Sequence, residues 1–135
     1  MKNWITAAIF GLAIASVSLP TRAQLETVQR QTWLVTDSAQ NKLSFKLTVS
    51  YPTGAVEGSV SYNGGIDNVS GVVCVSGCTT VNLVRTIPSE HGGGIQTFTG
   101  NINISQSGVW TASGAWSGTG AGGGSNTWTA TITRG

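Results

Sequence analysis

The clearest pattern in this chain is a strict alternation of apolar and polar side chains over residues 42–50. Leu43, Phe45, Leu47 and Val49 occupy the odd positions, and every even position is polar. A period of two is typical of a β-strand with one buried and one solvated face. Shorter segments of strand character predict further strands near residues 32–36, 56–62, 71–74, 79–87, 98–104, 110–116 and 128–132.

These segments amount to about eight strands, and no helical period of useful length separates them. The connections are mostly short, so we expect strands that are neighbours in sequence to pair antiparallel. Closure of such a meander would remove exposed edges. The sequence therefore predicts an all-β fold, a small antiparallel barrel of about eight meandering strands. A two-sheet β-sandwich is the alternative, because strand number alone does not separate the two architectures.

The two cysteines, Cys74 and Cys78, are separated by three residues that include Gly77. In an extended chain their Cα atoms would lie roughly 13 Å apart, which is too far for a disulfide. Gly77 can adopt the positive φ of a three-residue hairpin loop and bring them opposite each other. We therefore expect a structural disulfide between Cys74 and Cys78. A metal site would need further ligands, and we expect none.

The first 23 residues resemble a secretory signal peptide. Lys2 precedes an apolar run over residues 4–19, and Ala23 offers a small residue for cleavage. A membrane anchor is the alternative, but the run is shorter than the ~20 residues that span a bilayer comfortably. We expect residues 1–23 to be cleaved and residues 24–135 to form a single all-β domain. The product would be secreted or periplasmic, without membrane insertion after cleavage.

Charge separates the predicted signal from the predicted domain. After residue 23 the basic residues balance the acidic ones, so the formal excess of +2 lies on Lys2 and Arg22. Phosphate-rich partners require clustered Lys or Arg, and no two basic residues of the domain are closer in sequence than Lys42 and Lys46. We therefore expect no nucleic-acid partner.

The residues that most enzymes need are sparse. His91 is the single histidine, and it begins a His-Gly-Gly-Gly segment similar to the oxyanion-hole loop of some lipases and esterases. That loop functions with a Gly-x-Ser-x-Gly nucleophile turn, which the chain lacks. We expect no enzymatic activity, no catalytic residues and no cofactor, and we expect His91 to be dispensable. A hydrolase centred on His91 remains a minor alternative.

Small residues interrupt the rows predicted to face inward: Gly58, Gly100, Ala112, Gly114 and Ala130. They could leave space for a ligand cavity, or they could accommodate the bending of tightly coiled strands. Arg85 continues an inward row through Leu83 and Ile87. A buried guanidinium needs a partner, which could be an internal carboxylate or carbonyl, solvent at the barrel mouth, or a ligand.

These features favour an exported, non-enzymatic binding module for a small molecule or saccharide, with aromatic side chains of the barrel as the contact surface. The candidate ligand-binding residues are Arg85, Tyr51, Tyr62, Trp110, Trp116 and Trp128. The alternative is a structural or protein-interaction subunit of the cell surface or extracellular matrix. Such a subunit would associate through an open strand edge or through polar Thr and Ser faces.

Processing and redox state can be tested together. The exported protein should begin near Gln24, with Cys74 bonded to Cys78. Intact-mass measurement before and after reduction and alkylation would show both features. Retention of Met1, or two thiols that alkylate without reduction, would contradict the interpretation.

Overall fold

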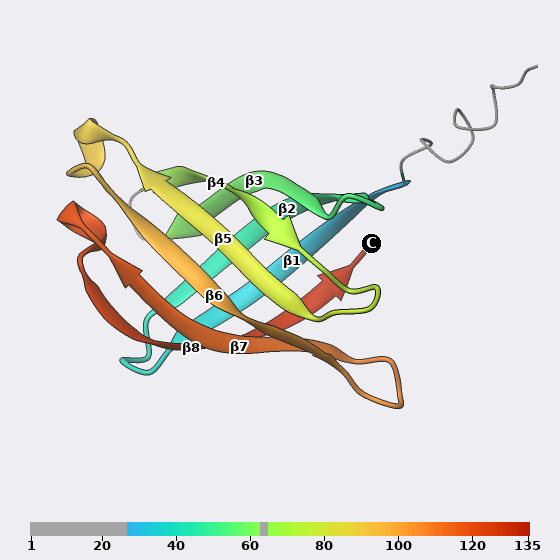
Figure 1. Ribbon diagram of the computed structural model, residues 1–135. Coiled ribbons are helices and arrows are strands. Elements are labelled where there is room, and N and C mark those ends of the chain that lie inside the picture. The colour runs from blue at the N-terminus through green and yellow to red at the C-terminus, as the bar shows by residue number, and fades with distance from the viewer. Residues whose placement is uncertain (1–26, 63–64) are drawn as a thin grey trace, which may run out of the picture.

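The computed structural model describes residues 27–62 and 65–135. The expected signal segment, residues 1–23, lies outside the described residues. The described chain forms a closed antiparallel barrel with strands in sequence order (Figure 1). Its strands are β1 (Thr27–Asp37), β2 (Lys42–Tyr51), β3 (Ala55–Tyr62), β4 (Gly65–Val73), β5 (Thr80–Ile87), β6 (Gly94–Ile104), β7 (Trp110–Gly118) and β8 (Gly124–Arg134).

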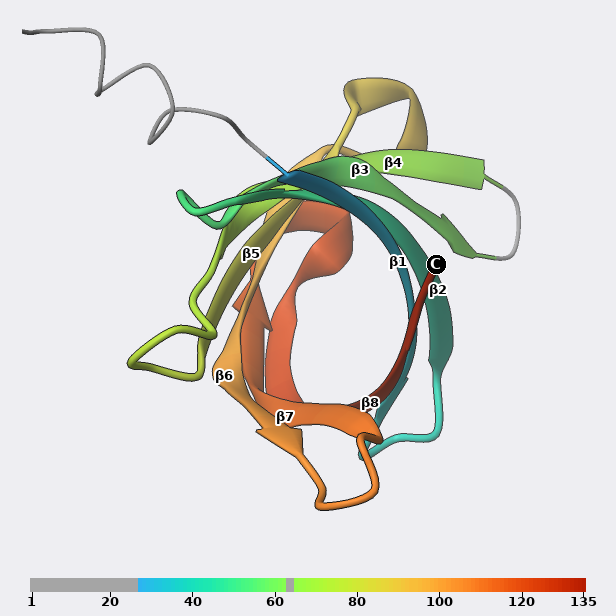
Figure 2. The same ribbon diagram turned by 90° about the vertical axis from the view of Figure 1, so that its right-hand side faces the viewer.

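The predicted eight-stranded barrel is confirmed. Strand β1 pairs with β2 on one side and with β8 on the other, so the sheet closes on itself (Figure 2). The two sheets of a sandwich are not formed. Because neighbouring strands are antiparallel, every second connection lies at the same end of the barrel. We call the end with the β1–β2, β3–β4, β5–β6 and β7–β8 connections the odd-loop end.

Several strands begin earlier than the sequence pattern predicts. The extension is largest in β4, which starts at Gly65 rather than near Gly71. In this stretch Ile66 is exposed and Asp67 is buried, which reverses the usual relation between polarity and side. Pairing with β3, from Tyr62↔Gly65 onward, holds the segment in the sheet despite its weak hydrophobic pattern.

Cys74 and Cys78 occupy the connection between β4 and β5, as predicted. A disulfide joins them, with their Cα atoms 5.5 Å apart. Gly77 has φ of +78°, which is the left-handed conformation expected for this loop. The cross-link therefore closes a short hairpin connection at the end of the barrel opposite the odd loops.

Aromatic rings fill the middle of the barrel. Phe98 lies at the centre of the group, with its ring centroid 5.3 Å from that of Phe45 and 6.2 Å from that of Trp128. Trp33 and Trp116 extend this cluster on either side. The indole N–H of Trp128 donates to two backbone carbonyls, those of Thr99 and Ala115. The inner face is thus a packed core in which the aromatic polar group is also satisfied.

The inward glycines mark close approaches between backbones. Gly100 and Gly114 lie opposite each other on β6 and β7. A Cβ added to Gly114 would fall on the carbonyl oxygen of Thr99 and lie 2.6 Å from Gly100 Cα. Gly58 has the same relation to β2, where an added Cβ would fall on the Lys46 carbonyl oxygen. These positions accommodate strand bending, so they do not provide the ligand cavity that the sequence left open.

Two short 3-10 turns belong to the odd-loop end: η3 (Ser89–His91) and η4 (Gly120–Gly122). Gly122 is buried, and a Cβ added there would lie 2.6 Å from Gln96 Cγ and 2.8 Å from Ile87 Cδ1. The β7–β8 loop therefore packs onto inward side chains and covers part of this end of the barrel. Among the described residues, no helix is long and apolar enough to cross a membrane.

Replacing Gly114 with Leu should destabilise the protein. A side chain here meets the backbone of β6, and overpacking of this kind typically costs about 1 to 3 kcal/mol or more. Thermal melts would measure the loss, with Ala115→Leu as the control because Ala115 is the next residue and is exposed. A Gly114→Leu variant as stable as wild type, or uptake of an apolar fluorescent probe that this variant blocks, would restore the cavity.

Candidate functional site

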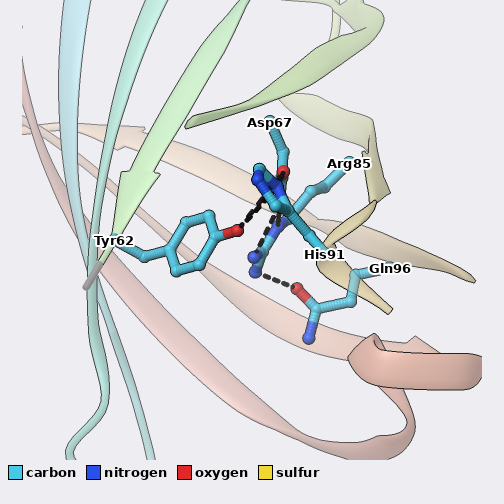
Figure 3. A network of polar contacts seen from close by, with 5 residues as sticks. All are labelled: Tyr62, Asp67, Arg85, His91 and Gln96. Atoms are coloured by element: carbon cyan, nitrogen blue, oxygen red, sulfur yellow. Dashed lines mark hydrogen bonds and ion pairs between the residues drawn. The ribbon is translucent and has the colours of Figure 1, made fainter. Parts of the chain in front are cut away.

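Three neighbouring strands present polar side chains to the barrel interior near the odd-loop end: Asp67 on β4, Arg85 on β5 and Gln96 on β6 (Figure 3). Arg85 donates from Nε at 2.9 Å and from Nη2 at 2.8 Å to Asp67 Oδ2. Its Nη1 donates to Gln96 Oε1 at 2.8 Å. Arg85 therefore points inward as predicted. Of the partners left open for it, the internal carboxylate is the one observed, so its charge is balanced without a ligand.

His91 and Tyr62 complete this polar cluster. The η3 turn brings His91 Nδ1 within 3.0 Å of Asp67 Oδ1 and within 3.0 Å of the Tyr62 hydroxyl. The Tyr62 ring also lies against Arg85, whose Cζ is 4.6 Å from the ring centroid. His91 thus links a loop to side chains from two strands, because the loop and the inward row of β4 meet at the same end of the barrel (Figure 3).

The electrostatics of the cluster centre on Asp67, whose side chain is fully buried. Burial alone would raise the pKa of Asp67, since it disfavours the charged form. Hydrogen bonds from His91 and Arg85, together with the positive charge of Arg85, outweigh burial and hold the pKa of Asp67 below its ordinary value of 3.8. The carboxylate is therefore ionised at neutral pH and paired with a cation that is itself buried.

This arrangement orients the imidazole of His91. An ionised carboxylate only accepts hydrogen bonds, so the contact with Asp67 places a hydrogen on Nδ1 of His91. The side chain of His91 is 31% exposed. Sequence reasoning did not find these contacts of His91, because Asp67 and Tyr62 are distant from the η3 turn in sequence. The dispensability of His91 for binding stays a prediction.

The Asp67–His91 pair resembles two members of a catalytic triad, but the third member is missing from the described part of the chain. A nucleophilic hydroxyl would have to face Nε2. The recorded hydroxyl contact, from Tyr62, is at Nδ1 on the same side as the carboxylate. Within residues 27–62 and 65–135, no group of three His, Cys, Asp or Glu side chains could hold a metal ion either. The cluster is a polar network that joins the η3 turn to side chains of β3, β4, β5 and β6.

The structure does not bring the six sequence-predicted binding residues together. Tyr62 and Arg85 belong to the cluster at the odd-loop end, whereas Trp128 is 2% exposed in the core. Tyr51 lies near the opposite end, where its hydroxyl accepts a hydrogen bond from Gln31 Nε2 at 3.4 Å. Trp110 lies there too, beneath the Arg134 guanidinium. Trp116 is half-buried and packs against the core, with its ring centroid 6.4 Å from that of Phe98.

A groove of about 760 Å³ lies on the outer surface of the barrel and crosses β1, β8 and β7. Its size is within the usual range of ligand sites, roughly 300 to 1,000 Å³. Leu34 lies within it and is 55% exposed. Around Leu34 the groove presents hydroxyl side chains: Thr36, Ser44, Thr111, Ser113, Thr129 and Thr131. Sequence reasoning missed this site because it depends on which outward residues the closed register sets side by side.

The outer face that continues from this groove carries no charge over five strands. From β4 to β8 the described outward side chains are Thr, Ser, Asn and small or aliphatic residues, up to Arg134 at the chain end. The other two charged residues within these strands, Asp67 and Arg85, point inward and are buried. In contrast, Arg30, Lys42, Lys46 and Glu57 lie on β1, β2 and β3.

Comparisons with known proteins identify no relative: no family model, no curated protein and no solved structure matches this chain.

The low pKa of Asp67 predicts a specific acid sensitivity. A group whose pKa is lower in the folded state adds stability above its unfolded pKa, about 3.9, and that stability is lost as the pH falls through the folded pKa. Between pH 6 and pH 2, wild type should lose more unfolding free energy than Asp67→Asn. Glu57→Gln, at an exposed acid, serves as the control and should follow wild type. Equal acid slopes for Asp67→Asn and wild type would contradict the pairing.

Proposed function

We propose that this protein is an exported, non-enzymatic binding module for a saccharide, and that the outer groove around Leu34 is its binding site. The observation that carries the proposal is the groove itself, a concave surface of ligand size whose lining joins neutral hydroxyls to an exposed aliphatic side chain. Sugars present the same combination, because their hydroxyls alternate with apolar C–H surfaces.

The chemistry of the lining supports a neutral, hydroxyl-rich ligand. Ser and Thr hydroxyls both donate and accept hydrogen bonds, so they can match sugar hydroxyls in either role. Leu34 offers apolar contact in the midst of them. Lys42 lines the groove from β2 and is its one side chain charged at neutral pH. A ligand here therefore needs no compensating charge, and a strongly anionic one would find a single cation.

The site differs from the aromatic surface that the sequence suggested. Trp128 is buried in the core, and its indole N–H is already bound to backbone carbonyls. Tyr62 is the one member of the six candidate residues that lines the groove. Because rings fill the middle of the barrel, binding on the outer surface leaves the core undisturbed.

The alternative function, a structural or protein-interaction subunit, would have to use faces of the barrel. The closing pairs between β1 and β8 leave none of the described strands with an open edge for strand addition. Large exposed hydrophobic residues such as Ile66, Ile95 and Val109 lie on different strands and loops. Because they are dispersed, they do not form one apolar patch that would favour a protein partner over a ligand in the groove.

A glycan array followed by calorimetry tests the proposal. The exported protein is screened against neutral hexasaccharides of glucose, xylose, mannose and N-acetylglucosamine, and the best probe is titrated into wild type and variants. Leu34→Arg should weaken binding by about tenfold or more, equivalent to ~1.4 kcal/mol, because it puts a charge and a long side chain into the groove.

The matched control is Val72→Arg, since Val72 is 51% exposed, on β4 and outside the groove. Its affinity should stay within twofold of wild type, and His91→Ala should do the same. Absence of binding to every neutral probe, or equal losses in Leu34→Arg and Val72→Arg, would overturn the assignment of the groove.

A further inference from the structure

A second hollow lies directly beside the first on the outer face of the β7–β8 hairpin. It measures about 430 Å³, and Thr97, Thr99, Ala115, Ser117, Ser125 and Thr127 contribute to its lining. Trp116 also borders it, between the outward residues Ala115 and Ser117, while its indole packs against Phe98 in the core. Every residue of its lining is uncharged.

The register of β7 and β8 shows how the two hollows are related. The Ser113↔Thr129 pair lines the first groove, and each of these residues is two positions from the Ala115↔Thr127 pair, which lines the second hollow. Outward residues two positions apart in a strand are separated by about 6.7 Å. The hollows therefore lie next to each other along one hairpin, and we call the two together the track.

We propose that this track binds an extended, neutral polysaccharide chain, with successive sugar units in the two hollows. The inference rests on the proposed function, and it adds that the ligand is a polymer and that it is uncharged. A free monosaccharide would fill one hollow only. A chain that runs along the hairpin can fill both, and the second set of contacts then forms without a second loss of translational freedom.

The neutrality of the ligand follows from the scarcity of charge on the surface, since Lys42 in the first groove is the one charged side chain that lines either hollow. Anionic polymers are bound through Arg and Lys, whose hydrogen bonds to carboxylates and sulfates are charge-assisted. The outer face of β4 to β8 has no such residue before Arg134. Neutral hydroxyl and amide groups cost less to desolvate than charged ones, so a row of Thr, Ser and Asn side chains can exchange water for sugar hydroxyls.

The hairpin also offers an apolar contact at each hollow. Leu34 supplies it in the first groove, and the exposed methyl group of Ala115 supplies a smaller one in the second.

The test measures how affinity depends on chain length. Calorimetry with the di-, tetra-, hexa- and octasaccharide of the best neutral glycan should show affinity rising about tenfold or more from the shortest to the longest probe, as the second hollow is filled. Thr127→Lys, in the second hollow, should reduce the octasaccharide affinity to that of the disaccharide and leave the disaccharide affinity unchanged. Leu34→Arg should weaken all four probes.

Asn82→Lys is the matched control, because Asn82 lies on the same uncharged face, on β5, outside both hollows. It should bind every probe like wild type. Three results would overturn the proposal of an extended neutral ligand. The first is an affinity that does not depend on chain length, and the second is equal octasaccharide affinity in Thr127→Lys and Asn82→Lys. The third is binding of polygalacturonate as tight as that of the neutral glycan. If the disaccharide still bound and its binding depended on Leu34, the proposed saccharide-binding function would stand. Absence of binding at every chain length would contradict both the proposed function and the extended ligand.

Sedimentation velocity of the same proteins tests whether a second copy of the chain, rather than a polysaccharide, binds to this face. The wild type should sediment as a monomer at micromolar concentration. A concentration-dependent dimer that Thr127→Lys abolishes and Asn82→Lys retains would assign the track to self-association and contradict the proposal.

Discussion

The pairing of β1 with β8 is the contact on which the rest of the barrel depends. Residues 31–37 lie opposite residues 128–134, so the first and last strands complete the ring of backbone hydrogen bonds. Such pairing joins residues that are far apart in sequence. Its entropic cost is high, because nearly the whole domain must be ordered before the contacts between these strands form and offset that cost. Once formed, it removes both edges of the sheet and encloses the inward side chains. The interior is packed because closure turns one side of every strand inward, and the other side of every strand is left on the outer face.

The buried ion pair near the odd-loop end shows how a filled barrel accommodates charge. Taking Arg85 and Asp67 out of water is costly, and their attraction offsets that cost only with good geometry and further hydrogen bonds. Gln96, Tyr62 and His91 supply those bonds and contacts. The cluster holds the η3 turn against β3 and β4. Arg85 and Asp67 thus satisfy each other's charge without a ligand.

The fold was predictable because its signals are local. Alternation over residues 42–50 and in similar segments indicated the strands, and the short connections indicated a meander. Gly77 between two cysteines indicated a reversal, and the phase of β5 indicated that Arg85 points inward. Each inference needed only neighbouring residues, and the structure bears out each of them.

The candidate sites were less predictable because they depend on register between strands. His91 and Asp67 are 24 positions apart, and nothing near either residue indicates their contact. The inward glycines looked like empty space, since the sequence does not show how closely the backbones of β6 and β7 approach. The hollows on the outer face arise from side chains of several strands, which only the closed register sets side by side.

The central claim is that the interior is a core and the outer face of β1, β8 and β7 is the binding surface. Amide and indole NMR shifts during titration with the bound neutral glycan test this claim most directly. The account predicts shifts at outward positions such as Leu34, Thr129 and Thr131, with the indole N–H signals of Trp33 and Trp128 unmoved. Large shifts of those two indoles, with the outward amides unchanged, would contradict it and place the ligand inside the barrel.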